Sequence, residues 1–194
     1  MDSISQLKKL REETGISMIE CKKALEEAGS NLERAKEILR EKGKEMIKDK
    51  GSRGANQGLV ASYIHPGSKL GVLLQIHSET DFVAKSEEFK KLARELCLQI
   101  AAMKPLFLRE EDIPEDFLDG ERKIYQKQFA DSGKPKEIVD KIIDGKLEKY
   151  KKEICLESQS WVKEPSKNVS DLLADYVAKI GERIEITKFS RYEI

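Results

Sequence analysis

The sequence SETDFVA, residues 78–84, joins a strand-like run at 70–77 to a helix-like run at 89–103. A hydroxyl at its start, from Ser78 or Thr80, can accept an unpaired amide proton of the turn that follows. Phe82 is the unusual residue, because a large apolar ring beside Asp81 either caps the local core or is offered to a partner. From the residues alone, the simpler interpretation is a capped strand-to-helix junction.

The composition is that of a well-solvated protein with a real core. The chain has 194 residues, of which 37% are charged and 39% hydrophobic, and its 36 Lys and Arg balance its 36 Asp and Glu. Zero net charge argues against direct nucleic-acid binding through bulk positive charge. No run reaches the length of a membrane span, and the first four residues do not resemble a signal peptide. We therefore expect a cytoplasmic protein.

The three cysteines are far apart, and each lies within a helical pattern. Cys21, Cys97 and Cys155 are best interpreted as buried or half-buried thiols of a reducing compartment. Neither His65 nor His77 lies at ligand spacing from a cysteine, so we expect no metal site and no cofactor.

Residues 1–50 are predicted to form three helices separated by glycines. Apolar residues recur at helical spacing in each segment. Ser17 with Glu20, and Ser30 with Glu33, have the spacing of capping boxes. The predicted product is a three-helix, ubiquitin-associated-like bundle that binds a partner. Residues 51–57 are predicted to be a linker because glycine and serine loosen the backbone there.

Residues 58–194 are predicted to form an α+β core domain. Two apolar runs within 58–76 flank Pro66-Gly67, which suits a tight turn. Both runs carry apolar residues on both faces, so helices should cover at least one face. A helix beginning near Ser86 is expected to do so. A terminal strand from Ile184, with a break in alternation before Phe189, would complete a three-stranded antiparallel sheet containing a bulge.

A pair of charged helices is predicted at about residues 114–155. Pro114 and Pro135 suit first helical turns, and a short connection favours an antiparallel pair. Residues 106–108 are predicted to form a short strand before this pair. Trp161, after it, is expected in a loop as a pin into the core rather than a binding anchor.

The sequence contains no convincing catalytic motif. The glycines near Arg53 lack the lysine and spacing of a phosphate-binding loop, and paired carboxylates carry little information in so charged a chain. A generic binding module, suggested by the three-helix start, and a small hydrolase using scattered carboxylates remain as alternatives to the function considered next.

Several motifs resemble those of the bacterial elongation factor Ts family, in its short form. The two most specific are TGISMIECKKAL at residues 14–25 and ETDFVA at 79–84. Gly58-Leu59-Val60, Gly133-Lys134-Pro135 and FSRYE at 189–193 fit as well. The first motif departs mildly from the family pattern, and Ser160-Trp161 replaces its usual proline and phenylalanine.

The resemblance implies a guanine-nucleotide exchange factor for elongation factor Tu that does no covalent chemistry. It places the family's magnesium-dislocating wedge on Thr80, Asp81, Phe82 and Val83. The wedge would enter the partner near its magnesium and phosphate site and promote GDP release, which allows GTP to bind. This implication reverses the simpler interpretation of Phe82.

The resemblance also implies a second contact, made by the N-terminal bundle. Gly15, Met18, Lys22 and Lys23 would lie near the partner's nucleotide domain, although Met18 could equally belong to the bundle core. Longer family members carry a further subdomain and a protruding coiled coil. This short chain is similar to members that work as homodimers, so a two-plus-two complex with elongation factor Tu is an expectation.

Overall fold

The structure is a computed structural model that describes residues 3–49, 54–130, 133 and 135–194, with only the backbone at position 48. The chain divides into two compact units. Unit 1 comprises Met1–Ala101 with Ser170–Ile194, and unit 2 comprises Ala102–Val169. The boundaries expected at residues 50 and 58 stay predictions, and part of the expected linker, 51–53, lies outside the described residues.

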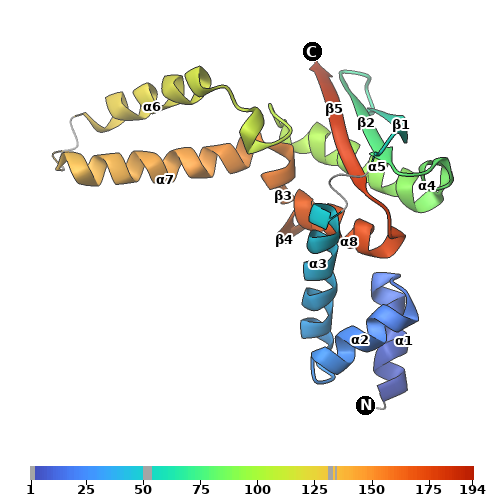
Figure 1. The fold of residues 1–194 in the computed structure, drawn as a ribbon. Helices are drawn as coiled ribbons and strands as arrows, with labels where there is room; N and C mark the ends of the chain where they lie inside the picture. The colour runs from blue at the N-terminus through green and yellow to red at the C-terminus, as the bar shows by residue number, and fades with distance from the viewer. Residues whose placement is uncertain (1–2, 50–53, 131–132, 134) are drawn as a thin grey trace. The chain divides into compact units, whose positions relative to one another are not determined.

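Unit 1 begins with the three predicted helices, α1 (Ser3–Thr14), α2 (Met18–Glu27) and α3 (Leu32–Asp49). Figure 1 shows them in blue and cyan. Their apolar stripes meet in one small core, whose buried members are Leu10, Ile16, Cys21, Ala24, Leu25, Ala35, Ile38 and Leu39. The predicted three-helix start is therefore confirmed.

The helix starts in the bundle are capped by side chains, with one correction to the prediction. The Ser17 hydroxyl accepts the Glu20 N–H at 3.3 Å, as expected. The predicted cap at Ser30 is wrong, because Ser30 has a φ of 66° and ends the preceding turn. Asn31 caps α3 instead, since its Oδ1 accepts the Arg34 N–H at 3.1 Å.

The predicted sheet is present in unit 1. Strands β1 (Gln57–Ile64) and β2 (Leu70–Ser78) form the hairpin, and β5 (Ile184–Glu193) pairs antiparallel with β2 to give the order β1-β2-β5. Gly67 takes a φ of 92° in the hairpin turn. The register of β2 with β5 shifts so that Thr187 is left as the extra residue of a bulge. The α+β fold class and the bulge are both confirmed.

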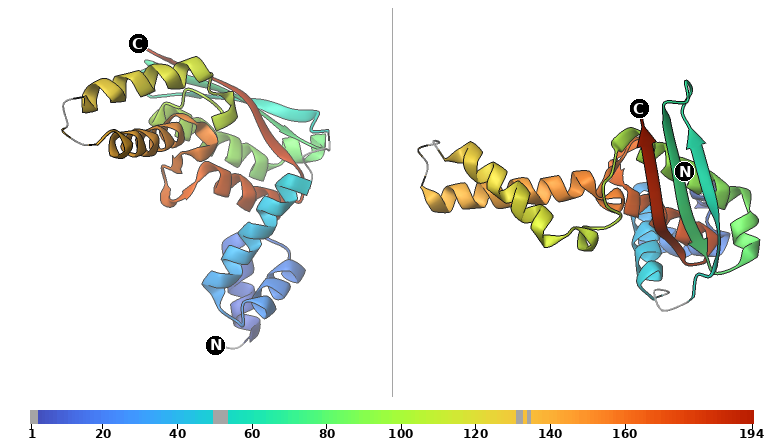
Figure 2. Two further views of the ribbon diagram at one scale, coloured as in Figure 1. Left: turned by 60° about the vertical axis from the view of Figure 1, so that its left-hand side comes forward. Right: turned by 90° about the horizontal axis from the view of Figure 1, so that it is seen from above.

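Helix α5 (Glu87–Met103) covers one face of this sheet (Figure 2). Its buried stripe consists of Phe89, Leu92, Ala93, Leu96, Cys97, Gln99 and Ile100. Val72, Leu74 and Ile76 of β2 are buried on the same side. The other face of the sheet carries exposed apolar side chains, at Val60, Ile64, Leu73 and Tyr192. Within the described part of unit 1, helices therefore cover one face of the sheet and leave these side chains on the other exposed.

Helix α8 (Val169–Ile180) joins the bundle to the sheet within unit 1. Asp175 of α8 pairs with Arg40 of α3 at 3.4 Å, and Asp171 pairs with Lys44. A side chain at Gly43 would collide with the carbonyl of Ala174, so the two helices need glycine there. No helix in the described ranges is long and apolar enough to cross a membrane.

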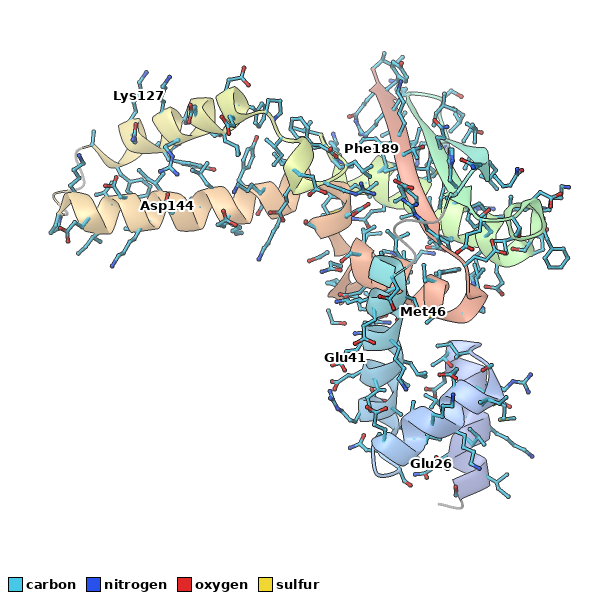
Figure 3. All side chains as sticks on the ribbon, viewed as in Figure 1. Glu26, Glu41, Met46, Lys127, Asp144 and Phe189 are labelled. Carbon is cyan, nitrogen blue, oxygen red and sulfur yellow. The ribbon has the colours of Figure 1, made fainter. Side chains whose placement is uncertain are left out.

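Unit 2 is dominated by α6 (Glu115–Phe129) and α7 (Lys136–Ile154), which run antiparallel and correspond to the predicted helical pair. Arg122 of α6 donates a hydrogen bond at 2.7 Å to Asp144 of α7, which is labelled in Figure 3. Phe117 stacks on Tyr150 near the base of the pair, with ring centroids 6.3 Å apart. The helices are thus joined by apolar and charged contacts.

Short elements complete unit 2. Two 3-10 turns, Glu110–Asp112 and Leu156–Ser158, flank the helical pair. The strand predicted at 106–108 is wrong, because only Phe107 forms a bridge, to Cys155. Trp161 is half-buried on β3 (Ser160–Trp161), which pairs with β4 (Glu164–Asn168), so the expected loop is a small hairpin.

Candidate functional site

The stretch that follows β2 is fixed by hydrogen bonds to a distant segment. Glu182 lies just after α8, and its carboxylate accepts two bonds from Thr80. The Thr80 hydroxyl donates at 2.7 Å and the Thr80 backbone N–H at 3.0 Å. The hydroxyl of buried Ser78 donates to the Thr80 carbonyl at 3.0 Å. Thr80 is therefore held on three of its polar groups.

A second contact between the same two segments runs in the opposite direction. The Glu79 carboxylate accepts the backbone N–H of Arg183 at 2.7 Å. The chain can turn here because Gly181 takes a φ of 80°, a conformation that favours glycine. The corner between α8 and β5 is thus bonded to the corner between β2 and the next helix.

The next helix, α4 (Asp81–Lys85), is a single short turn capped at both ends. The Thr80 hydroxyl accepts the Val83 N–H at 3.3 Å, and the Ser86 hydroxyl donates to the Val83 carbonyl at 2.7 Å. The expectation of a capped junction is therefore right, and Thr80 is the residue that caps it.

The same turn buries two of its side chains and exposes one. Val83 and Ala84 are 7% and 8% exposed, whereas Phe82 is 82% exposed. The interpretation of Phe82 as a core cap is wrong. Its ring points away from a backbone that hydrogen bonds and two buried neighbours hold in place. An apolar ring presented on a fixed base is a typical anchor for a protein partner.

Asp81 adds a fixed negative charge beside the ring. Its carboxylate accepts a hydrogen bond from the Lys85 ammonium at 2.7 Å, one helical turn away. This bond and the positive charge of Lys85 lower the pKa of Asp81. The carboxylate therefore stays ionised well below neutral pH and can act as an acceptor toward a partner.

The predicted bundle residues gather around the start of α2. Gly15 has a φ of 70° and turns the chain between α1 and α2. Met18 is 38% exposed, so it does not belong to the bundle core. Lys22 and Lys23 are exposed and make surface ion pairs along α2, with Glu26 and Glu20 respectively. These residues form a mixed apolar and basic surface.

The two groups of predicted residues are separate surfaces. No hydrogen bond or ion pair in the described part of the chain joins the group at 80–83 to the group at 15–23. Each of the two surfaces contacts a residue that lies on α8 or just after it. Lys179 is so close to Gly15 that an added side chain at that position would collide with it, and Glu182 binds Thr80.

Sequence reasoning missed three residues that belong to these surfaces. Ile19 is 69% exposed beside Met18, and its place next to a predicted site residue was a usable signal. Lys85 could have been found from its spacing of four residues after Asp81. Glu182 could not, because it meets Thr80 across 102 positions of sequence.

Neither the cysteines nor the acidic residues suggest a catalytic centre. Cys21, Cys97 and Cys155 are buried free thiols, as predicted, and burial raises the pKa of Cys97 and of Cys155 to about 11. Such thiols are poor nucleophiles at neutral pH. Among the described residues, no three His, Cys, Asp or Glu side chains gather as metal ligands would.

Comparisons with known proteins agree with the motifs. The family model described as "Elongation factor TS" matches residues 6–194. Elongation factor Ts of Caldanaerobacter subterraneus subsp. tengcongensis is 46% identical over 193 residues, which cover 100% of this chain and 96% of the relative. That of Thermotoga petrophila is 47% identical over 99% of this chain and 96% of the relative. The chain therefore belongs to the elongation factor Ts family, the exchange factors that act on elongation factor Tu in translation elongation without being enzymes.

Proposed function

We propose that this chain releases GDP from elongation factor Tu with a wedge formed by Thr80, Asp81, Phe82 and Val83. The wedge would press against the part of the partner that holds magnesium and the phosphates. The observation that carries the proposal is Phe82, whose ring is 82% exposed on a fixed turn. The close match of residues 79–84 to the family's second motif also supports it.

Burying the Phe82 ring against a partner would contribute a sizeable free energy of binding. Burying a phenylalanine side chain is worth about 2 kcal/mol, and this ring is withheld from the chain's own core. Inserted between packed elements of a partner, it would move them apart and disturb metal coordination indirectly. Asp81 would bring an ionised acceptor close to the groups that held the metal and phosphates.

Exchange then follows from linkage rather than from chemistry. A factor that binds nucleotide-free elongation factor Tu more tightly than the GDP-bound form must weaken GDP binding by the same factor. Each stabilising contact of the wedge must therefore favour the nucleotide-free conformation. A contact made equally in both conformations would raise affinity without releasing GDP.

The bundle surface of Gly15, Met18, Lys22 and Lys23 is proposed to provide binding rather than release. Its lysines lie in exposed ion pairs that a partner's acidic groups could replace at little cost. Exposed Met18, four residues before Lys22, supplies an adaptable apolar contact beside them. This division of labour predicts that bundle variants change affinity while wedge variants change the release rate.

A homodimer, and with it a two-plus-two complex, is proposed from the uncovered face of the sheet. Val60, Ile64, Leu73 and Tyr192 are between 49% and 71% exposed there. A second copy of the same face would bury them. Light scattering should give a dimer for the wild type and a monomer for Leu73→Glu, and a wild-type monomer at micromolar concentration would contradict this proposal.

We also propose that the chain is located in the cytoplasm. Three buried free thiols suit a reducing compartment, where translation elongation takes place. Detection of the chain outside the cytoplasmic fraction of its cell would contradict it.

The deciding experiment is stopped-flow release of fluorescent GDP from elongation factor Tu, measured against factor concentration. Phe82→Ala should lose most of the maximal release rate while remaining folded. Leu106→Ala is the matched control, because it also removes a well-exposed apolar side chain but lies outside both surfaces. Met18→Ala with Lys22→Ala should raise the concentration needed for half-maximal release.

The outcomes separate the parts of the proposal. Equal acceleration by wild type and Phe82→Ala would place the wedge elsewhere while leaving the exchange activity intact. Failure of both to accelerate release would contradict the mechanism as a whole. An unchanged half-maximal concentration in the bundle variant would remove that surface from the interface.

A further inference from the structure

The corner between α8 and β5 is hydrogen-bonded directly to the start of the wedge. Glu182 accepts the Thr80 hydroxyl at 2.7 Å and the Thr80 N–H at 3.0 Å with its two carboxylate oxygens. One residue further on, the Arg183 N–H donates to Glu79 at 2.7 Å. Three hydrogen bonds therefore join two segments that are 102 residues apart.

These bonds determine where α4 begins. The Thr80 hydroxyl that donates to Glu182 also accepts the Val83 N–H at 3.3 Å, so one atom both anchors and caps the turn. Thr80 has an extended backbone, with φ −120° and ψ 155°, before the helical residues start. Rotation of that residue would swing the whole turn, and with it Phe82.

The direction of the Phe82 side chain depends on the backbone of α4. Its ring is 82% exposed, so packing does not fix its direction. The direction comes from the backbone of α4, which is five residues long and cannot hold itself as a helix. Val83 and Ala84 fix the buried side of the turn, and the hydrogen bonds with Ser78, Glu182 and Arg183 fix its start.

We propose that Glu182 is a positioning residue for the wedge, acting through Thr80 and not by touching the partner's nucleotide site. The proposal rests on the proposed role of Phe82 in GDP release. A wedge held in its working direction before binding loses less conformational entropy when it inserts. Loss of Glu182 should therefore lower the maximal rate of GDP release and not simply weaken the complex.

The position of Glu182 gives this role a second consequence. It follows α8, the helix that also binds the N-terminal bundle through Asp175 and Asp171. At the end of the same helix, Lys179 pairs with Glu88 of α5 at 2.6 Å and lies against Gly15. One helix thus supports both candidate contact surfaces, and Glu182 is its connection to the wedge.

The test uses the full chain with Glu182→Ala, Glu182→Gln and Phe82→Ala in the stopped-flow assay of GDP release. Hydrogen bonds to charged groups are worth enough that Glu182→Ala should lower the maximal release rate about tenfold. The concentration for half-maximal release should change much less. Glu182→Gln should recover most of the rate, because an amide of the same shape can bond to both Thr80 groups.

A second readout does not depend on activity. Hydrogen exchange of the Thr80 amide should be slow in the wild type and faster in Glu182→Ala, because its acceptor has been removed. Glu193→Ala is the matched control: it removes a paired carboxylate from the opposite end of β5 and should change neither readout. If Glu182→Ala does not fold, Glu182→Asp serves in its place, because its shorter side chain draws the carboxylate away from both Thr80 groups.

Three results would overturn the inference. Wild-type release by folded Glu182→Ala, with release lost in Phe82→Ala, would leave the wedge intact and remove Glu182 from it. Slow release by Glu182→Ala with unchanged exchange at the Thr80 amide would mean that Glu182 acts by another route. A wild-type rate of GDP release by Phe82→Ala would contradict the proposed role of Phe82 and, with it, the need for Glu182 to position the ring.

Discussion

Two phenylalanines seven residues apart, Phe82 in α4 and Phe89 in α5, have opposite environments in spite of similar local sequence. Phe82 follows Thr80 and Phe89 follows Ser86. The hydroxyl of each of these two residues accepts an amide proton of the first turn of the helix that follows it. Phe82 is 82% exposed, whereas Phe89 is fully buried. Helix capping alone therefore does not decide which ring reaches the core.

The difference arises from the register of each ring relative to its cap. Phe82 lies two residues after Thr80, and the following Val83 and Ala84 take the core-facing positions of α4. Phe89 lies three residues after Ser86, at the start of a buried stripe that continues along α5. Val83 and Ala84 thus fill the core-facing positions of α4, and the large ring of Phe82 is left outside. A ring excluded by register is available to a partner without destabilising the fold.

The sharpest way to test the comparison is to remove each ring in turn. Phe89→Ala should lower the free energy of unfolding by about 4 kcal/mol, because it leaves a cavity in a packed core. Since a domain of this size is stabilised by only about 5–15 kcal/mol, this loss is a large part of the total. Urea denaturation followed by circular dichroism measures this loss.

Phe82→Ala provides the reference for that measurement. Removing an exposed side chain should change the free energy of unfolding by no more than about 0.5 kcal/mol. A loss from Phe82→Ala similar to that from Phe89→Ala would mean that Phe82 packs against the chain in solution, and the comparison would fail.

Ser86 is the residue that joins the two helices, and its loss should have an intermediate effect. Its hydroxyl donates to the Val83 carbonyl at 2.7 Å at the end of α4 and accepts the Phe89 N–H at 3.2 Å at the start of α5. Ser86→Ala should therefore cost about 1 kcal/mol of stability in the same denaturation experiment. Recovery by Ser86→Thr, which keeps the hydroxyl, would identify capping as the cause, and a neutral Ser86→Ala would show that neither bond contributes.

Much of the fold was predictable because its signals are local. Apolar spacing identified the three N-terminal helices and α5, and Pro66-Gly67 identified the hairpin. The break in alternation before Phe189 located the bulge. In each of these segments the periodicity of the sequence and the final burial agree. Errors occurred where neighbours compete for one role, as at Ser30, where Asn31 provides the cap instead.

The candidate surfaces were predictable only in part. Motif resemblance identified residues 79–84, but the exposure of Phe82 depends on its register against the core, which local sequence does not state. Glu182 carries no local signal, because its role comes from a contact across 102 positions. Trp161 was assigned to a loop from the composition of residues 159–165, whereas the structure has a short pairing of β3 with β4 whose register is shifted. Long-range contacts therefore account for most of what the sequence did not reveal.

The smallest expected effect concerns the ion pair between Asp81 and Lys85 on the surface of α4. The Lys85 ammonium lowers the pKa of the Asp81 carboxyl below its value in the unfolded chain, which is about 4. The pair should therefore contribute its full stabilisation above that unfolded value and lose it as the pH falls through the lower, folded pKa. Because both side chains are exposed, the contribution is screened by salt. Asp81→Asn should shift the urea midpoint slightly at pH 7 and progressively less as the pH falls below about 4, and the shift at pH 7 should shrink in 1 M salt. A shift that stays equal as the pH falls would show that the amide changes the packing of α4 rather than its charge.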